Sequence, residues 1–192
     1  MKKIVSLILV LVLALLSVQA LADRSVSGTY YDTETLEGLP PFKFEHMKKG
    51  IGKGLCPVYS APYKDAYRAN NGKAAVDSNS YIDIGGFNEN GWLLVRYETN
   101  KGNWRVGWIP PEYVKGIETS MTFHFGRIEQ VAEEDITVTE NNKNPNNSRS
   151  VIGQIEAGET YYVLGYYNYT GYELWYVEFD LDGQTAWGFI FR

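Results

Sequence analysis

The chain has 192 residues, of which 15% are aromatic and 21% are charged, and its formal net charge is −5. Its single cysteine cannot form a disulfide within the chain, and a 44% share of hydrophobic residues argues against disorder. The acidic balance excludes a typical nucleic-acid binder, which presents a basic face.

The first 22 residues have the pattern of a secretory signal peptide. Lys2 and Lys3 precede an apolar run from Ile4 to Val18, and Ala20 and Ala22 supply the small residues that a signal peptidase reads. The run of about 15 residues is shorter than the roughly 20 needed to span a bilayer. Cleavage after Ala22 therefore predicts an exported protein without a membrane span, and the lysine-rich start is typical of bacteria. The expected location is extracellular, with attachment to the cell wall left open.

The next segment, residues 23–40, is polar and rich in turn formers. We expect it to form an N-terminal arm or linker, with Thr29–Tyr31 as a short strand.

The rest of the chain contains two stretches that match in order at an offset of about 80 residues. A fixed offset of this kind indicates tandem duplication of one small unit. The predicted units are residues 41–118 and 119–192. The matched segments are 42–44 with 123–125, 55–58 with 135–138, 69–73 with 141–148, 92–97 with 174–179, and 106–109 with 187–190.

Both units have the pattern of short β-strands. In Trp92–Tyr97, alternate side chains would face opposite sides of a sheet, and Gly, Asn and Asp punctuate the segments between strands. No stretch longer than about 12 residues has a convincing helical period. The sequence thus predicts an all-β protein made of two small barrels or sandwiches.

The order of these elements resembles that of bacterial Src-homology-3-like (SH3-like) domains. The first unit has a strand, a long polar loop, the strand Trp92–Tyr97, a tight hairpin and the segment Gly107–Val114. The resemblance covers residues 50–117 and implies two tandem SH3-like small barrels. In the second unit, over 130–192, it rests on Ile136–Glu140, Gly158, Trp175–Phe179 and Gly188–Phe191.

The second unit departs from this pattern at its end. The sequence stops at Arg192 without a counterpart of Pro110–Val114. The family's last strand would be missing, and proteins normally avoid an exposed sheet edge. We expect an earlier segment to pair there, with Thr122–Ile128 as the candidate and Phe42–Met47 as its equivalent in the first unit.

Candidate catalytic chemistry is sparse. Cys56 could act as a nucleophile with His46 or His124, but its repeat counterpart is Ile136 and it shares strand parity with Val58. Both facts favour a small buried position in a core. We predict no catalytic residue and no enzymatic activity.

Asp180–Gly183 is similar to the start of a calcium loop. Its glycine comes two positions early, and no glutamate follows where the loop needs one. A hairpin turn is the better interpretation, and no metal site or cofactor is predicted.

The aromatic residues give the functional hint. Eukaryotic relatives of the family bind peptides in an aromatic groove between two loops. The resemblance places Trp92 at the mouth of such a groove, Pro110 and Tyr113 on its floor, and Tyr59 and Tyr63 on its other wall. The alternative is that Trp92 and Tyr113 only cover the end of the barrel.

Seven tyrosines crowd residues 161–176 of the second unit. On alternating strands they cannot all face one small core, so we expect some to be exposed for glycan or protein contacts. The alternative is that they pack between the two units.

The expected function is a secreted, non-catalytic binding module that recognises bacterial cell wall, as a peptidoglycan peptide or glycan, through aromatic grooves. The alternative is a protein–protein interaction or scaffold component of an extracellular complex. An enzyme would require Cys56 to be exposed beside a histidine. The acidic charge weighs against binding to anionic wall polymers.

Overall fold

The computed structural model describes residues 29–31, 39, 41, 43–47, 54–77, 80–117, 124–143, 150–169 and 172–191. The predicted signal peptide lies outside these ranges. The described residues are mostly strands, so the predicted all-β class is confirmed. None of the helices within these ranges has the length and apolar character required to cross a membrane.

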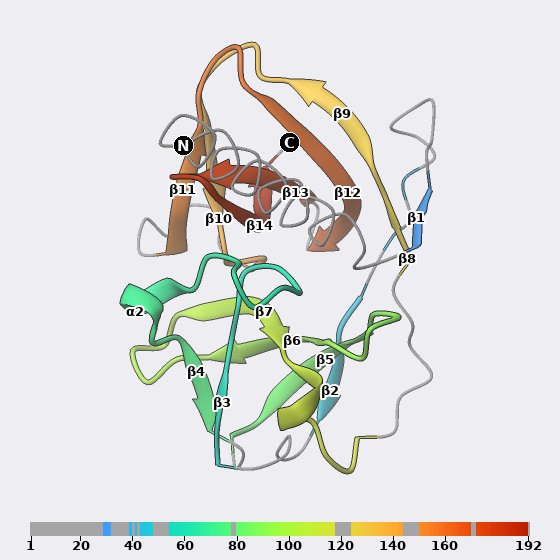
Figure 1. Ribbon diagram of the computed structural model, residues 1–192, viewed down its shortest axis with the longest axis vertical. Coiled ribbons are helices and arrows are strands. Elements are labelled where there is room, and N and C mark those ends of the chain that lie inside the picture. Colours follow the sequence, from blue (N-terminus) through green and yellow to red (C-terminus); the bar gives the residue numbers. More distant parts are fainter. Residues whose placement is uncertain are drawn as a thin grey trace, which may run out of the picture.

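The first unit, residues 45–117, forms the lower half of the molecule in Figure 1. A four-stranded sheet has the order β2-β5-β6-β7, and β3 pairs with β4 beside it. A bridge between Tyr59 and Trp108 joins the two sheets. The elements are β2 (Glu45–Met47), β3 (Leu55–Pro57), α2 (Ala69–Gly72), β4 (Ala75–Asp77), β5 (Ile82–Phe87), β6 (Leu93–Glu98), β7 (Trp104–Ile109) and the 3-10 helix η2 (Pro111–Tyr113).

The second unit, residues 128–191, is a six-stranded sheet with the order β11-β10-β14-β13-β12-β9. Thr139 of β10 pairs with Phe189 of β14. The strands are β9 (Ile128–Val131), β10 (Ile136–Thr139), β11 (Val151–Ile155), β12 (Thr160–Tyr169), β13 (Tyr172–Leu181) and β14 (Gln184–Phe191).

The two units share one order of strand pairing. With the bridge included, the first runs β4-β3-β7-β6-β5-β2, and the second runs β11-β10-β14-β13-β12-β9. The register also shifts at matching points, between Ile84 and Gly86 in the first unit and between Val163 and Gly165 in the second. This agreement gives each strand of one unit a counterpart in the other.

A close backbone contact also recurs. A Cβ atom added to Gly107 would lie 2.4 Å from Val58 Cγ1 and 2.7 Å from the Tyr59 carbonyl oxygen. A Cβ atom on Gly188 would lie 2.5 Å from Val138 Cγ1 and 2.9 Å from the carbonyl oxygen of Thr139. Each glycine therefore lets β7 or β14 pass directly against the end of β3 or β10.

Both segments that we expected to cover a free edge are paired. Glu45 of β2 pairs with Ile84 of β5, and Ile128 of β9 pairs with Val163 of β12. They cover the outer edges of β5 and β12, and neither of them pairs with β10.

The N-terminal arm is built into the second half of the molecule. Thr29–Tyr31 forms the predicted strand, β1, which pairs in parallel with β8 (His124–Gly126). Leu39 is buried in the core of the second unit, and Pro41 bridges to Tyr166. The arm therefore crosses the second unit before the chain enters the first, as the blue strand β1 beside β8 indicates in Figure 1.

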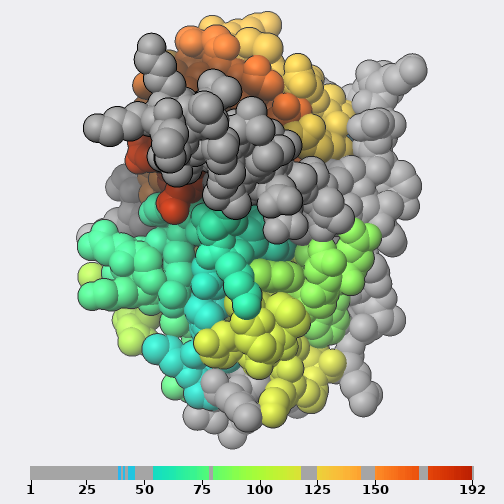
Figure 2. Space-filling model, viewed as in Figure 1, coloured from blue at the N-terminus to red at the C-terminus, as the bar shows by residue number. Residues whose placement is uncertain are grey.

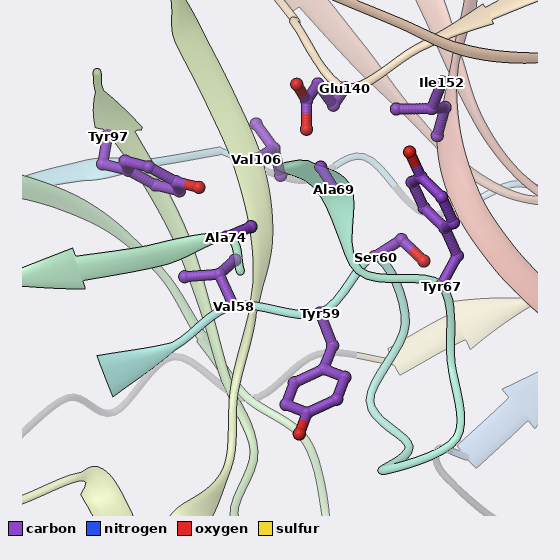
Figure 3. Close-up of a pocket in the computed structure, with 10 residues that line it drawn as sticks. All are labelled: Val58, Tyr59, Ser60, Tyr67, Ala69, Ala74, Tyr97, Val106, Glu140 and Ile152. Atoms are coloured by element: carbon purple, nitrogen blue, oxygen red, sulfur yellow. The ribbon is translucent and has the colours of Figure 1, made fainter. Parts of the chain in front are cut away.

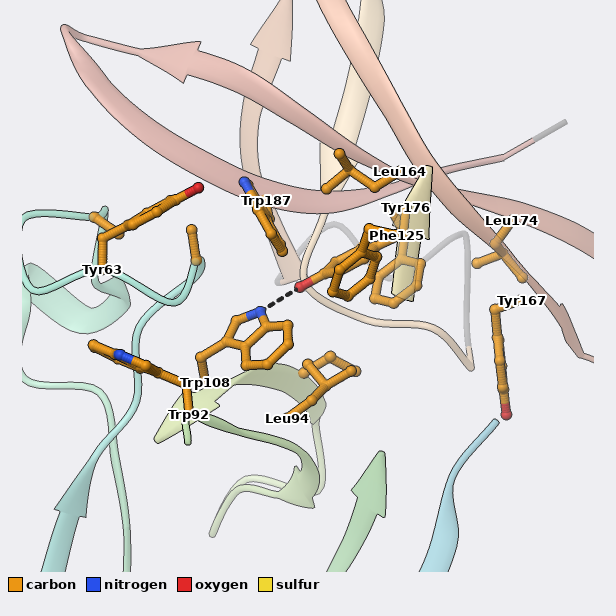
Figure 4. Packing of buried hydrophobic residues seen from close by; sticks show 14 residues of the cluster. Tyr63, Trp92, Leu94, Trp108, Phe125, Leu164, Tyr167, Leu174, Tyr176 and Trp187 are labelled. Carbon is orange, nitrogen blue, oxygen red and sulfur yellow. Dashed lines mark hydrogen bonds between the residues drawn. The ribbon is translucent and has the colours of Figure 1, made fainter. Parts of the chain in front are cut away.

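Three hydrophobic cores hold the structure. One lies inside the first unit around Val58 and Leu93, and a second lies inside the second unit around Val138 and Val177. The third, which we call the shared core, contains residues of both units (Figure 4). Its buried members are Ala61, Tyr63, Ala66, Trp92, Leu94, Val106, Trp108, Phe125, Leu164, Tyr167, Leu174, Tyr176, Trp187 and Phe189.

Trp108 occupies the middle of the shared core and is fully buried. Its indole Nε1 donates a hydrogen bond of 3.0 Å to the Tyr176 hydroxyl, drawn as a dashed line in Figure 4. Its ring makes edge contacts with Phe125 and Trp187, at centroid distances of 5.9 and 5.8 Å. Aromatic contacts of this kind add to the burial of apolar area, so a common core joins the two units.

The crowded tyrosines of the second unit occupy two cores. Tyr161 is buried in the core of the second unit, whereas Tyr167 and Tyr176 are buried in the shared core. Tyr162 and Tyr166 are half-buried. The expected exposed tyrosines are therefore not found among these five, because both faces of β12 and β13 are covered. The alternative of packing between the units is confirmed for Tyr167 and Tyr176.

Candidate functional site

The predicted groove residues lie in different environments. Trp92 and Tyr63 are each 7% exposed and belong to the shared core. The Tyr63 ring meets Trp187 of the second unit edge-on, with centroids 6.0 Å apart. Two of the five side chains that a free groove would need are therefore buried, and the second unit contacts one of them, Tyr63.

Of the other three predicted residues, Tyr59 and Tyr113 are partly exposed and Pro110 is not. Tyr59 is half-buried and meets the Trp92 ring edge-on at 5.6 Å, so the structure brings these two together. Pro110 is buried. Tyr113 is half-buried against the core of the first unit, and its carbonyl oxygen lies 4.0 Å from Cys56 Sγ. Ligand binding by the set of five stays a prediction.

Tyr59 borders a surface hollow of about 450 Å³, which we call the loop hollow. Most of its wall comes from the long loop between β3 and β4, and Gln184 comes from the start of β14. The Tyr67 amide donates to the carbonyl oxygen of Thr185 at 3.1 Å, which ties the loop to the second unit. In Figure 2 the loop, in green, lies on the surface where the two halves meet. The lining residues are Tyr59, Lys64, Asp65, Ala66, Tyr67, Arg68, Asn71, Gly72 and Gln184.

The far end of the long loop turns through left-handed backbone. Asn70, Asn71 and Gly72 have φ values of 57°, 52° and 74°. Asparagine and glycine tolerate this region better than other residues, which explains why they occur here in sequence. The turn is closed by hydrogen bonds from Gly72 N–H to the Arg68 carbonyl and from Ala74 N–H to the Ala69 carbonyl.

Cationic groups dominate the loop hollow. The Arg68 guanidinium lies over the Tyr59 ring at 5.5 Å, and its Nε donates to the Ala74 carbonyl oxygen at 2.8 Å. Lys64 Nζ lies 3.0 Å from a carboxylate oxygen of Glu112, with 72% of the lysine side chain exposed. Asp65 adds one carboxylate to the lining. The arrangement suits a polar, extended ligand that carries both a negative and a positive group. Such a ligand could also place one edge against the Tyr59 ring.

The pair of Lys64 and Glu112 is charged at neutral pH. A hydrogen bond to Glu112 raises the pKa of Lys64. A backbone hydrogen bond at Glu112, followed by the bond from Lys64, lowers the pKa of Glu112. The pair links the long loop to η2 across the surface where the groove was predicted.

A second, internal polar site lies between the units (Figure 3). Its cavity of about 10 Å³ has room for one water. Arg105 Nε of β7 lies 2.6 Å from a carboxylate oxygen of Glu140, which follows β10. Burial raises the pKa of Glu140 to about 7, and the charge of Arg105 acts in the opposite direction. Ser60 Oγ, which also lines the cavity, has no hydrogen-bond partner among the described residues.

Cys56 and the Asp180–Gly183 segment have structural roles in the described residues. Cys56 is fully buried, as predicted for a core position. The side chains of His46 and His124 lie outside the described part of the structure. Asp182 and Gly183 form the predicted hairpin turn between β13 and β14, where Asp180 Oδ1 accepts the Gly183 N–H at 2.8 Å. Within the described ranges, no cluster of three or more His, Cys, Asp and Glu residues could hold a metal ion.

Sequence reasoning missed Lys64, Arg68 and Gln184 of the loop hollow. The first two were visible as charges beside the predicted wall residues Tyr59 and Tyr63. Gln184 had no local signal, since only the docking of the second unit brings it there.

Comparison of the chain with protein-family models, with curated proteins and with solved structures gave no match. The resemblance to Src-homology-3-like domains therefore stays a prediction from the residue pattern.

Proposed function

We propose that the protein is a secreted, non-catalytic binding protein that recognises bacterial cell wall, with a peptidoglycan peptide held in the loop hollow. The observation that carries the proposal is the hollow itself, of about 450 Å³, with an aromatic residue flanked by cationic groups at the surface. Binding sites for small extended ligands commonly combine a ring face with a few placed polar groups.

The chemistry of the hollow fits a short peptide with free carboxylates. Lys64 and Arg68 offer donors for carboxylates, and Asp65 offers an acceptor for an amine. Peptidoglycan stem peptides carry both kinds of group. The local cations also let an acidic protein bind such a peptide, since charges beyond about 8 Å are largely screened at physiological ionic strength.

The test is co-sedimentation of the chain without residues 1–22 with purified peptidoglycan. We expect retention in the pellet, release by soluble stem peptide, and clear loss of retention in Lys64→Glu. Lys115→Glu is the matched control, because Lys115 is exposed on the same unit and lies outside the loop hollow. Absence of sedimentation above a control protein, or equal loss in both variants, would contradict the proposal.

The second candidate is a protein-interaction component. Among the described residues, the exposed large hydrophobic side chains include Leu55, Tyr81, Val131 and Val151. Exposed apolar side chains that form a patch favour a protein partner. Cross-linking in culture medium followed by mass spectrometry would detect such a partner.

A further inference from the structure

The end of the first unit covers one side of that unit's core. Tyr113, Val114 and Ile117 follow β7 and pack against it. The residues beneath include Cys56 and Ile109, which are fully buried, and the Tyr113 carbonyl oxygen lies 4.0 Å from Cys56 Sγ. This final segment keeps solvent away from the ends of β3 and β7.

The equivalent place in the second unit is hollow among the residues that the structure describes. The pairing order makes Ile136 the counterpart of Cys56 and Ile190 the counterpart of Ile109. Ile136 and Ile190 line a hollow of about 620 Å³, which we call the end hollow. Phe191 is half-buried there.

The rim of the end hollow is acidic. Glu133, Glu134 and Asp135 line it and are exposed, and the described part of its lining includes no lysine or arginine. Val131 adds an apolar side chain that is 57% exposed. An apolar floor with a carboxylate rim selects a ligand that has apolar side chains and positive charge.

We propose that the end hollow binds an extended segment of a partner protein, with aromatic or aliphatic side chains on the floor and lysine or arginine beside the rim. The final segment of the first unit shows what shape of occupant such a floor accepts. The three carboxylates define its charge. The site is separate from the loop hollow, so this proposal does not rest on the proposed function.

The expected binding mode is addition of an extended segment beside the start of β10, where pairing with β14 is limited to Thr139. A segment beside the start of β10 would lie where the first unit keeps Val114 and Ile117. Extended peptides that add to an exposed sheet edge gain main-chain hydrogen bonds and place alternate side chains in pockets. Since the rim charges are exposed, the affinity should fall as salt is added.

The test uses fluorescein-labelled peptides and the whole mature chain in a fluorescence anisotropy titration. One probe has the sequence of residues 111–117, Pro-Glu-Tyr-Val-Lys-Gly-Ile, and a second has lysine in place of the glutamate. A scrambled version of the lysine probe is the reference. We expect the lysine probe to bind several-fold more tightly than the glutamate probe and to lose affinity in high salt. Equal affinity of the lysine probe and its scrambled version overturns the proposal.

Reversing the charge of two rim glutamates tests whether the lysine probe binds at the rim. The double variant Glu133→Lys/Glu134→Lys should weaken binding of the lysine probe about tenfold, as expected for two exposed charge contacts. Glu45→Lys/Glu89→Lys makes the same change in net charge at exposed positions of the first unit and should leave binding unchanged. Equal loss in the two double variants would show that only net charge matters and would overturn the proposal.

Thiol labelling tests whether the end hollow is open in the free protein. Thr137 is exposed and lines the hollow, whereas the natural Cys56 is fully buried. In Thr137→Cys, the introduced thiol should react with a maleimide as fast as a surface cysteine, and the lysine probe should slow the reaction. Slow labelling without the probe would mean that another segment of this chain covers the hollow, and the proposal would be wrong.

Discussion

The two units have the same backbone plan but opposite charges at one matching position. Arg96 of β6 and Glu178 of β13 occupy equivalent places beside the shared core, two residues after Leu94 and Tyr176. Each charge is neutralised by a different kind of partner. The comparison teaches that the common glycine contacts and strand order maintain the fold, while the facing surfaces have changed so that they fit each other.

In the first unit, the neutralising group is close and buried. Arg96 Nε donates to Asp83 Oδ2 at 2.7 Å, and one of its terminal nitrogens donates to the Tyr167 hydroxyl of the second unit at 2.8 Å. In the second unit, Glu178 accepts a 2.8 Å hydrogen bond from the Trp187 indole. Its cationic partner, Arg127, lies 3.4 Å away and is 35% exposed.

The largest expected effect on stability comes from replacing Trp108, which lies in the middle of the shared core. Trp108→Ala removes the centre of the shared core and should lower the free energy of unfolding by about 4 kcal/mol. Urea unfolding, followed by tyrosine fluorescence and circular dichroism, should give one transition in the parent protein, since both units contribute to that core. Trp104→Ala, at a half-buried position on the same strand, should have a smaller effect. Two separate transitions in the parent chain would mean that the units fold independently.

The next largest effect distinguishes the two charges. Arg96→Met leaves Asp83 buried without its cation and should cost about 3 kcal/mol of stability. Glu178→Gln keeps an acceptor for Trp187 and should cost no more than about 1 kcal/mol, because Arg127 can reach solvent. Chemical denaturation of both variants measures the difference. If Arg96→Met and Glu178→Gln lose similar amounts of stability, the difference that we infer between the two positions is wrong.

The glycine contacts should behave alike in both units. Gly107→Ala and Gly188→Ala each place a Cβ atom against backbone and valine atoms, and each should cost about 2 kcal/mol. Gly116→Ala is the control, since space is open there and only its φ of 67° is unfavourable. Its cost should be about 1 kcal/mol. Thermal unfolding of the three variants measures these losses of stability. Little loss in Gly107→Ala or Gly188→Ala would argue against a common backbone plan for the two units.

The smallest expected effect concerns pH at the junction of the units. The folded pKa of Glu140, about 7, lies above its ordinary value of 4.5, so the folded state binds this proton more tightly than the unfolded state. Stability from this group should therefore increase as pH falls from 8 to 5. Relative to Glu140→Gln, the parent protein should gain roughly 1–2 kcal/mol over that range. Urea titrations at both pH values check this, and parallel pH profiles would show that Glu140 does not titrate there.

Local pattern was enough to predict the all-β class and several of its parts. Alternation in Trp92–Tyr97 and the Asp182–Gly183 turn act over a few residues, so their effect is visible without tertiary structure. The buried position of Cys56 is predictable because its strand parity matches that of Val58. The short strand at Thr29–Tyr31 is predictable within the turn-rich arm, but its partner is not.

Contacts between the units could not be predicted in the same way. Tyr63 looks like a groove residue in an isolated unit, but in the structure its ring packs against Trp187 of the second unit. Gln184 reaches the loop hollow for the same reason. A sequence pattern reports which side chains are apolar, but not which of two available surfaces will cover them.

The pairing of β1 with β8 has a consequence for the order in which the chain folds. Thr29 pairs with His124, so the first described strand has no partner until more than half of the chain has been made. Synthesis proceeds from the N-terminus, and contacts between residues far apart in sequence slow folding. The parallel pair of β1 and β8 can therefore form only after β8 has been synthesised, as a late step of folding.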